Sequence, residues 1–282
     1  MDKQRSDHQV GEKEPPLQRF KRFISERPEI ILSPLIFIIF ILGWEWLVKV
    51  FEIKRILLPP PSDVVRALIR SFVEGDLIRH FGVTLYETIV GFFIGSILGL
   101  LLGALVSQFR IVEKTLYPYI VAFQTLPKVA IAPLIVVWFG YGYSSKIVIT
   151  ALIAFFPLLV NTIAGLHSTS PEYIEMLTAF TASKWQIFRM VKVPTALPFI
   201  FAGLDVAGIL SVIGAIVGEF VGARAGLGYM ILYRNFQLDT PGVFAILIVL
   251  SLLGIGVHVV INAIQSKVVF WTKPETERVI GA

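Results

Sequence analysis

Five ionisable side chains interrupt long apolar stretches of this sequence, and they are the first places to look for chemistry. They are Glu45, Glu87, Lys128, Asp205 and Glu219. A charged group is expensive inside a lipid bilayer and normally faces the interior of a helix bundle or an aqueous path. The chemistry that such residues support is the passage of a polar solute or the pairing of charges within the bundle.

Glu45 and Glu219 stand near the ends of their apolar stretches, where a side chain can reach the membrane surface, so we interpret both as interfacial. Lys128 lies in QTLPKVAIAPLIVVWFG, which two prolines break, and Asp205 lies in AGLDVAGILSVIGA. These two residues are our candidates for a solute pathway. The alternative is a structural polar contact, which includes pairing of Lys128 with Asp205, and the residues alone leave the two alternatives open.

No catalytic or nucleotide-binding motif is present in the sequence. It lacks a G-x-x-x-x-G-K-[ST] phosphate loop, an H-E-x-x-H zinc motif and a G-x-S-x-G nucleophile turn. The histidines have no metal-ligand spacing, and cysteine is absent, so there is no thiolate nucleophile. The glycine-rich GARAGLGYM, 222–230, does not follow a strand, so we do not assign it to phosphate binding. We expect no metal site, no cofactor bound by this chain and no enzymatic activity of its own.

The composition is that of a membrane protein. Hydrophobic residues make up 55% of the 282 residues and the mean hydropathy is +0.76, too apolar for a water-facing surface. Six stretches reach the ~20 apolar residues that a helix needs to cross a ~30 Å hydrocarbon layer. They cover about 30–50, 83–106, 116–139, 146–167, 196–218 and 241–265. They are too long for barrel strands, so we predict an all-α, polytopic membrane protein with about six transmembrane helices.

The distribution of Lys and Arg predicts the orientation. With the N-terminus inside, the inner segments carry fifteen basic residues and the outer segments nine, which favours cytoplasmic termini. The predicted organisation is a cytoplasmic tail at 1–28 without a removable signal peptide, a transmembrane domain at 29–267 with a cytoplasmic loop at 168–195, and a cytoplasmic tail at 268–282. Because this bias explains the net charge of +5, we do not predict nucleic acid as a partner.

Two further stretches predict how helices lie. Gly91, Gly95, Gly99 and Gly103 recur every fourth residue in the second span, which lets another helix approach closely along that face. We predict a tight helix seam there, either static or sliding during a conformational cycle. After the first span, LLPPPSDVVRALIRSFVEGD predicts a helix along the membrane surface with Ser62 as its N-cap.

The loop at 168–195 is polar and charged although it lies between two long apolar runs. Ser170 followed by Pro171 and Glu172 predicts a helix start, because a hydroxyl cap, a first-turn proline and an early acid all suit that place. Ser183 with Gln186 three residues later predicts a second start with a capping box.

The second of these short helices is predicted to end by Pro194, because a proline ring disfavours helical geometry at the preceding residue. The bend between the two helices falls near Thr181 and Ala182. The second helix has an apolar edge, Trp185, Phe188 and Val191, and a basic rim, Lys184, Arg189 and Lys192. Such a segment can lie flat on lipid, form an ordinary loop, or insert into a groove of a soluble partner.

These residues resemble the Glu-Ala-Ala loop of importer-type ATP-binding-cassette (ABC) permeases, whose pattern is Glu-Ala-Ala, three residues, Gly, nine residues, then Ile-x-Leu-Pro. Glu175 takes the acidic position, Val191 and Val193 the aliphatic ones and Pro194 the proline. Thr181 replaces the glycine, and Met-Leu replaces the two alanines. Because positive φ is uncomfortable for a β-branched residue, we expect the bend to be made differently or to be shallower.

The resemblance extends over about 57–270, through LPPPSDVV, LPKVAIAPLIVVWFGYGYSSKI, FFPLLVNT, ASKWQIFRMVKVPTALPFIFAGL and GEFVGARAGLGYMI. Together these blocks are similar to the permease branch that serves nitrate, sulfonates, taurine, aromatic carboxylates and vitamin-pyrimidine precursors. Asp205 departs from that branch, which usually has a basic residue after the Gly-Leu pair. The charge preference of the branch is therefore not carried over to this chain.

The resemblance implies a type I importer permease with a MetI-like fold in the bacterial cytoplasmic (inner) membrane. Two permease chains, identical or related, would form the pathway, and an external solute-binding protein would deliver the ligand. Two cytoplasmic ATPase subunits, which use ATP and Mg, would each accept a coupling helix from the loop at 168–195. The residues expected to dock there are Glu175, Ala179, Thr181, Ser183, Lys184 and Trp185.

Two other classes compete with this interpretation. An ATP-independent channel or secondary transporter is the alternative, but we find no filter-like sequence, inverted repeat or dense set of proton-relay carboxylates. A membrane enzyme ranks third, because no nucleophile or metal cluster is present.

Overall fold

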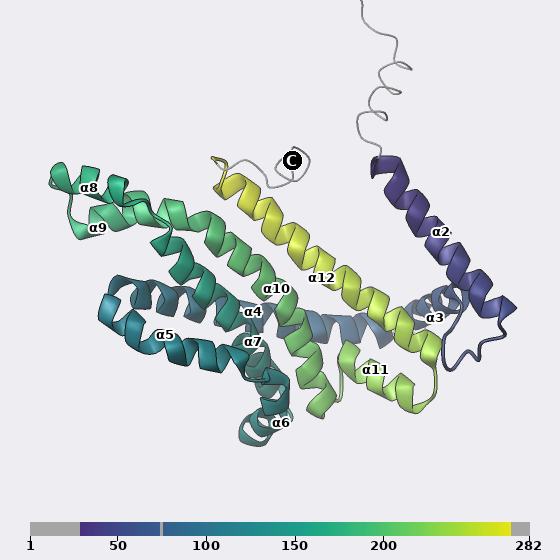
Figure 1. Cartoon of the computed structure of the whole chain (residues 1–282). Coiled ribbons are helices and arrows are strands. Elements are labelled where there is room, and N and C mark those ends of the chain that lie inside the picture. The colour runs from purple at the N-terminus through teal and green to yellow at the C-terminus, as the bar shows by residue number, and fades with distance from the viewer. Residues whose placement is uncertain (1–28, 74–75, 272–282) are drawn as a thin grey trace, which may run out of the picture. The chain divides into compact units, whose positions relative to one another are not determined.

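The computed structural model describes residues 29–73 and 76–271, and every regular element among them is a helix (Figure 1). The predicted all-α class is therefore confirmed. The predicted tail at 1–28 and residues 272–282 of the predicted C-terminal tail lie outside the described residues. The chain forms two compact units that divide between Asp63 and Val64.

Five described helices are long and apolar enough to cross a bilayer, and a bent helix pair can supply a sixth crossing. The first unit contains α2 (Glu29–Val50), and α3 (Pro61–Val73) begins at its end. The second unit contains α4 (Asp76–Gln108), α5 (Arg110–Thr125), α6 (Lys128–Phe139), α7 (Tyr143–His167), α8 (Pro171–Ala179), α9 (Lys184–Ile187), a π-helical segment (Phe188–Lys192), α10 (Val193–Gly222), α11 (Leu227–Phe236) and α12 (Thr240–Val268).

The Glu45 carboxylate caps the start of α3 within the first unit. Helix α3 begins at Pro61, one residue before the predicted N-cap, so Ser62 lies within its first turn and is not its N-cap. The backbone N–H of Ser62 donates to Glu45 Oε2 at 3.0 Å and its hydroxyl donates to Oε1 at 2.9 Å. Lys49 Nζ lies 2.7 Å from the same carboxylate. A proline at the first helical position has no N–H to satisfy, and an anion at a helix N-terminus is favourable, which explains the earlier start.

Helices α4 and α7 pack closely and run in the same direction. A Cβ built on Gly99 would come within 2.7 Å of the Phe155 carbonyl oxygen, and one on Gly103 within 2.8 Å of Thr162 Cβ. Added Cβ atoms on Gly91 and Gly95 would overlap Thr150 and Ala151. The predicted seam glycines therefore face α7 at van der Waals distance, which is how membrane helices gain dispersion contacts. Since both helices run the same way, residues 109–142 must return from one end of the bundle to the other.

Helices α5 and α6 make that return as one broken span, bent by 89°. The break falls at Leu126, which is extended (φ −60°, ψ 134°), directly before Pro127. A residue before proline is pushed out of helical geometry, which accounts for the break there. Pro133 lies inside α6 without ending it, so only one of the two predicted proline breaks is present.

Helix α10 continues the helical path that starts at Lys184, and the whole stretch Lys184–Gly222 is one span of 39 residues (Figure 1). The prediction that the helix ends by Pro194 is wrong. The backbone widens to π geometry before the proline, and Val193 N–H donates to the Phe188 carbonyl five residues back. We attribute the continuity to this wider turn, which leaves room for a ring that would otherwise clash with a carbonyl four residues earlier.

Helix α10 lies between α7 and α12 and runs antiparallel to both. Cβ atoms built on Gly203, Gly214 and Gly218 would meet Asn161, Thr150 and Lys146 of α7 in descending order. Phe201 near the start of α10 packs with Ile261 and Val269 at the end of α12. The loop at 168–195 and the end of α12 therefore lie at one end of the bundle. Helix α11 and the starts of α4, α7 and α12 lie at the other end.

Candidate functional site

The coupling loop, residues 168–195, joins α7 to the long helix and presents two short helices. Ser170 Oγ accepts from Glu172 N–H at 3.4 Å and caps α8. Ser183 Oγ accepts from Gln186 N–H at 3.3 Å, while Gln186 Oε1 accepts from Ser183 N–H at 2.7 Å. Both predicted helix starts are confirmed, including the reciprocal capping box. Each of these short helices therefore has a backbone N–H group of its first turn satisfied by its own capping side chain, which stabilises the helix start.

Thr181 forms the bend between α8 and α9 in the left-handed region, with φ +60°. Our expectation that a threonine would avoid positive φ is wrong. Thr181 N–H donates to Thr178 O at 2.9 Å and Ala182 N–H donates to Leu177 O at 3.0 Å, the pair of bonds of a Schellman motif. These bonds satisfy two carbonyls at the end of α8, which offsets the ~1–2 kcal/mol that a non-glycine residue pays in this region.

The six residues predicted to dock an ATPase are all exposed, and no residue of α8 is buried. Large apolar side chains share this surface. Phe180 is 76% exposed and Trp185 67%, and the Trp185 ring stacks on Phe188 with centroids 5.6 Å apart. Tyr173 and Met176 of α8 are exposed as well. A cluster of exposed apolar side chains on a loop and on the adjoining helix start is typical of a protein or membrane contact.

Lys128 and Asp205, the two pathway candidates, do not pair with each other. Lys128 Nζ donates to the Gln124 carbonyl at 2.9 Å and lies 4.9 Å from the centroid of the Phe156 ring. The lysine thus satisfies a carbonyl in the last turn of α5, beside the break. This hydrogen bond to the local backbone does not test whether Lys128 lines a solute pathway, so the pathway role stays a prediction.

Asp205 belongs to a polar cluster that joins α10 to α12. Asp205 Oδ1 lies 2.6 Å from His258 Nδ1, and Asn262 Nδ2 lies 2.9 Å from His258 Nε2. The side chains of Asp205 and His258 are 24% and 46% exposed on this single chain. Polar side chains at this depth normally face a bundle interior or a water-filled cavity. His258 and Asn262 lie one turn apart on α12, and neither was singled out from the sequence.

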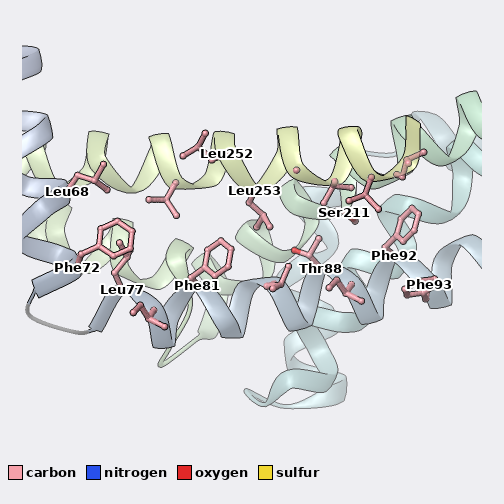
Figure 2. Close-up of a pocket in the computed structure, with 18 residues that line it drawn as sticks. Leu68, Phe72, Leu77, Phe81, Thr88, Phe92, Phe93, Ser211, Leu252 and Leu253 are labelled. Carbon is pink, nitrogen blue, oxygen red and sulfur yellow. The ribbon is translucent and has the colours of Figure 1, made fainter. Parts of the chain in front are cut away.

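A groove of about 680 Å³ runs between α4 and α12, and it does not suit a charged solute (Figure 2). Phe81 and Phe92 of α4 and Leu253 of α12 point into it. Thr88 and Ser211 are its polar lining residues. The groove lacks the convergent polar groups that orient a small polar ligand in a protein site.

Glu219, interpreted above as interfacial, is instead 1% exposed. It accepts a hydrogen bond from the Thr84 hydroxyl at 2.7 Å, across 135 residues of sequence. Lys146, counted above only as an orientation signal, is 2% exposed and lies close to Glu219 and Glu87. The sequence does show that all three ionisable side chains fall in or beside predicted spans. It does not show in which direction each side chain points, so their meeting could not be predicted.

The described residues contain no group of three or more His, Cys, Asp or Glu side chains that could hold a metal ion. The glycine-rich stretch 222–230 is not an open phosphate cradle, because the backbone N–H groups of Gly226, Leu227 and Gly228 already donate to side chains of this chain. The coupling loop and the polar residues of the spans therefore remain the candidate functional features.

The sequence matches the family model "Binding-protein-dependent transport system inner membrane component" over residues 92–270. It is 39% identical to the formylaminopyrimidine transport permease protein ThiX of Halalkalibacterium halodurans, over 86% of this chain and 96% of that protein. It is 35% identical to the riboflavin transport system permease protein RibX of Chloroflexus aurantiacus, over 90% of this chain and 93% of that protein.

The fold is also similar to a solved structure, an inward-facing conformation of the MetNI methionine ABC transporter. The TM-score is 0.60 at 25% identity, over 68% of this chain and 95% of that chain. The predicted MetI-like fold and the predicted family are thereby confirmed. The chain belongs to the inner membrane components of binding-protein-dependent transport systems, and it is a transmembrane permease subunit of an ABC importer.

Proposed function

We propose that a separate cytoplasmic ATPase docks on the coupling loop and drives this permease mechanically. The observation that carries the proposal is the form of the loop, which combines self-capped helices with exposed Phe180 and Trp185. A short rigid element with apolar anchors and a charged rim suits insertion into a groove of a partner. Glu175, Ala179, Thr181, Ser183, Lys184 and Trp185 form the docking surface.

The loop is also mechanically connected to the spans. Because Lys184–Gly222 is one span, a displacement of Trp185 by the ATPase is passed to α10 without an intervening flexible linker. Glycines of α4 and α10 bring these helices into close contact with α7, and closely packed helices change between discrete arrangements rather than bending continuously. The ATPase, with its ATP and Mg, therefore biases two arrangements of the bundle.

The assembly in this proposal contains two permease chains, identical or related, two ATPase subunits and an external solute-binding protein. The coupling loop and both termini face the cytoplasm, and α11 faces the outside of the bacterial inner membrane. The excess of Lys and Arg in the inner segments supports this orientation. The position of the coupling loop at the same end of the bundle as the end of α12 is consistent with it.

The solute in this proposal is a heterocyclic vitamin or vitamin precursor, because the similar proteins ThiX and RibX are a formylaminopyrimidine and a riboflavin transport permease. Asp205, His258 and Asn262 together offer hydrogen-bond donors and acceptors along one face of α10 and α12. Such a face can satisfy ring nitrogens and carbonyls of a heterocycle in transit, and Asp205 disfavours an anionic solute. Lys128 beside the α5–α6 break is the second pathway candidate.

Copurification tests the docking proposal. The full chain is coexpressed with a candidate ABC ATPase subunit, and Trp185→Ala with Glu175→Lys is expected to lower the bound ATPase by at least tenfold. Phe236→Ala is the matched control, because Phe236 is an 83% exposed aromatic residue on α11 at the opposite end of the bundle. Equal recovery of the ATPase with the loop variant and with the control would contradict the proposal.

A further inference from the structure

The turn between α10 and α11 is fastened to the bundle by side chains of two helices. Gly226 N–H donates to His80 Nδ1 at 2.9 Å, and Leu227 N–H donates to Thr84 Oγ1 at 2.8 Å. Gly228 N–H donates to Glu219 Oε2 at 2.5 Å. Three consecutive N–H groups at the start of α11 are thus satisfied by α4 and α10, and an anionic acceptor at a helix N-terminus is electrostatically favourable.

Glycine is required at two positions of this turn. Gly226 has φ +113°, and a Cβ on it would overlap the Glu219 carboxyl group. A Cβ on Gly228 would come within 2.8 Å of Glu219 Oε2. The glycines therefore let the backbone reach the carboxylate directly, which gives GARAGLG a function that its sequence pattern did not reveal.

Lys146 fastens the other side of the same turn. Its Nζ donates to the carbonyl of Gly222, the last residue of α10, and to the carbonyl of Tyr141, each at 2.6 Å. A cation at a helix C-terminus complements the helix dipole. The end of α10 and the start of α11 therefore each meet a buried side chain of the favourable charge.

The protonation pattern of the cluster follows from its hydrogen bonds. Glu219 accepts through Oε1 from Thr84 Oγ1 and through Oε2 from Gly228 N–H, so both of its oxygens act as acceptors. The Glu87 carboxyl group is 2% exposed and lies close to that of Glu219. Two buried carboxyl groups this close cannot both be ionised without a large energetic cost, so one of them carries a proton. Because Glu219 is occupied as an acceptor, the proton belongs to Glu87.

Charge balance supports the same assignment. The charged side chains close to Glu87 are Lys146 of α7 and Glu219 of α10. His80 lies seven residues earlier on α4, where it accepts from Gly226 N–H and stacks on Tyr229 of α11 at 5.8 Å. One lysine cation balances one carboxylate, and a second buried carboxylate would be left uncompensated. A protonated Glu87 leaves the lysine and Glu219 as a balanced pair.

We propose that Glu87 is a buried proton-holding site and that His80, Thr84, Glu87 and Glu219 form a latch fastening α11 to α4, at the end of the bundle opposite the coupling loop. The neutral Glu87 donates to Glu219, Glu219 orients the Thr84 hydroxyl, and Thr84 accepts from Leu227 N–H. Since Glu219 is on α10, an axial shift of α10 against α4 separates Glu219 from Thr84 and opens the latch.

The chain offers a clean reporter because it contains no cysteine. Met230 of α11 is 6% exposed, so Met230→Cys places a thiol where a membrane-impermeant maleimide reaches it only when α11 separates from the bundle. Labelling is measured on the full chain in membranes, in the presence and in the absence of the ATPase. It reports the latch directly and does not depend on ATPase docking, so failure of this inference and failure of the proposed function are distinguishable.

Each latch variant is combined with Met230→Cys. Glu87→Gln keeps a neutral side chain that can donate to Glu219, so labelling of the introduced thiol is expected to stay low. Glu219→Gln replaces an acceptor oxygen by an NH₂ group facing Gly228 N–H or the Thr84 hydroxyl, and labelling is expected to rise at least fivefold. Thr84→Val removes the central hydroxyl at nearly equal volume and is expected to act as Glu219→Gln does. The Thr84→Val variant still tests the latch if the Glu219 variant fails to insert into the membrane. Low labelling with both would overturn the latch.

Infrared difference spectroscopy tests the proton itself. Subtraction of the Glu87→Gln spectrum from that of the parent chain is expected to leave the C=O stretch of a protonated carboxyl group. A difference spectrum showing only carboxylate bands would overturn the proton assignment, and so would high labelling of the introduced thiol in the Glu87→Gln variant.

Discussion

Trp185 and Glu219 lie near opposite ends of one continuous span, Lys184–Gly222. The rise of 1.5 Å per helical residue places them about 50 Å apart along the axis. The exposed aromatic anchor of the coupling loop and the buried acceptor at the start of α11 thus belong to one rod. Movement imposed at one residue is transmitted to the other unless the helix bends.

Loss of ATPase docking should also abolish the coupling of ATP hydrolysis to transport. Glu175→Lys combined with Trp185→Ala is expected to leave the spans inserted and to abolish the stimulation of ATP hydrolysis by solute-loaded binding protein, because the lever loses its anchor. The measurement is ATP hydrolysis and solute uptake in proteoliposomes, with Phe236→Ala as the control. Unchanged stimulation together with unchanged uptake would refute the role of these residues.

Thr181→Gly is expected to remove backbone strain from the bend of the coupling loop and so to stabilise the bend. Glycine adopts φ +60° without the steric cost that threonine pays, so the left-handed conformation gains ~1 kcal/mol relative to threonine. Hydrogen exchange by mass spectrometry should show slower exchange for the peptide that contains the Thr181 and Ala182 amides. Thr178→Gly is the control, since Thr178 lies inside α8, where glycine weakens the helix. Faster exchange in Thr181→Gly would contradict this account.

The α4–α7 seam should not tolerate a single added methyl group. Gly95→Ala is expected to cost ~1–3 kcal/mol of stability, because the new Cβ overlaps the Ala151 carbonyl and the helices must separate. Gly254→Ala is the matched control within another span, since nothing lies within 4 Å of a Cβ built there. The stability of both variants is measured by thermal unfolding in detergent. Equal unfolding midpoints would show that the α4–α7 interface has room for the added methyl group.

Asp205 and His258 should act as one unit. Asp205→Asn and His258→Gln are each expected to reduce solute uptake several-fold, and the double variant is expected to be little worse than either single variant. Contacting polar pairs show coupling energies of roughly 0.5–3 kcal/mol in double-mutant cycles. Uptake is measured with binding protein in excess, and Lys128→Met serves as an independent pathway variant. Strictly additive losses for Asp205 and His258 would mean that the 2.6 Å contact plays no part in transport.

Local features of the sequence predicted local features of the fold. The apolar stretches predicted helical spans, because only closed hydrogen bonding survives in hydrocarbon. Ser170 and Ser183 predicted two helix starts, because each cap is made within three residues. The resemblance of the loop around Glu175 to a known permease pattern pointed to the family that the comparisons then showed.

Features that depend on helices meeting across the chain could not be predicted in this way. The partner of Glu219 is Thr84, 135 residues away, and Asp205 pairs with His258 on α12 rather than with Lys128. Hydropathy places a charge along the membrane normal, but it does not tell which neighbour it faces.

The sequence by itself determined that this chain is a bundle of membrane helices with a polar loop, because hydropathy and capping act over a few residues. Only the tertiary structure decided that Thr181 turns left-handed, that the helix runs on through Pro194, and that Lys146 and Glu219 are buried together. The physical reason is that each of these states is costly alone. Thr181 is stabilised by backbone hydrogen bonds of its own turn and Pro194 by the wider turn before it, while Glu219 needs the Thr84 hydroxyl of another helix.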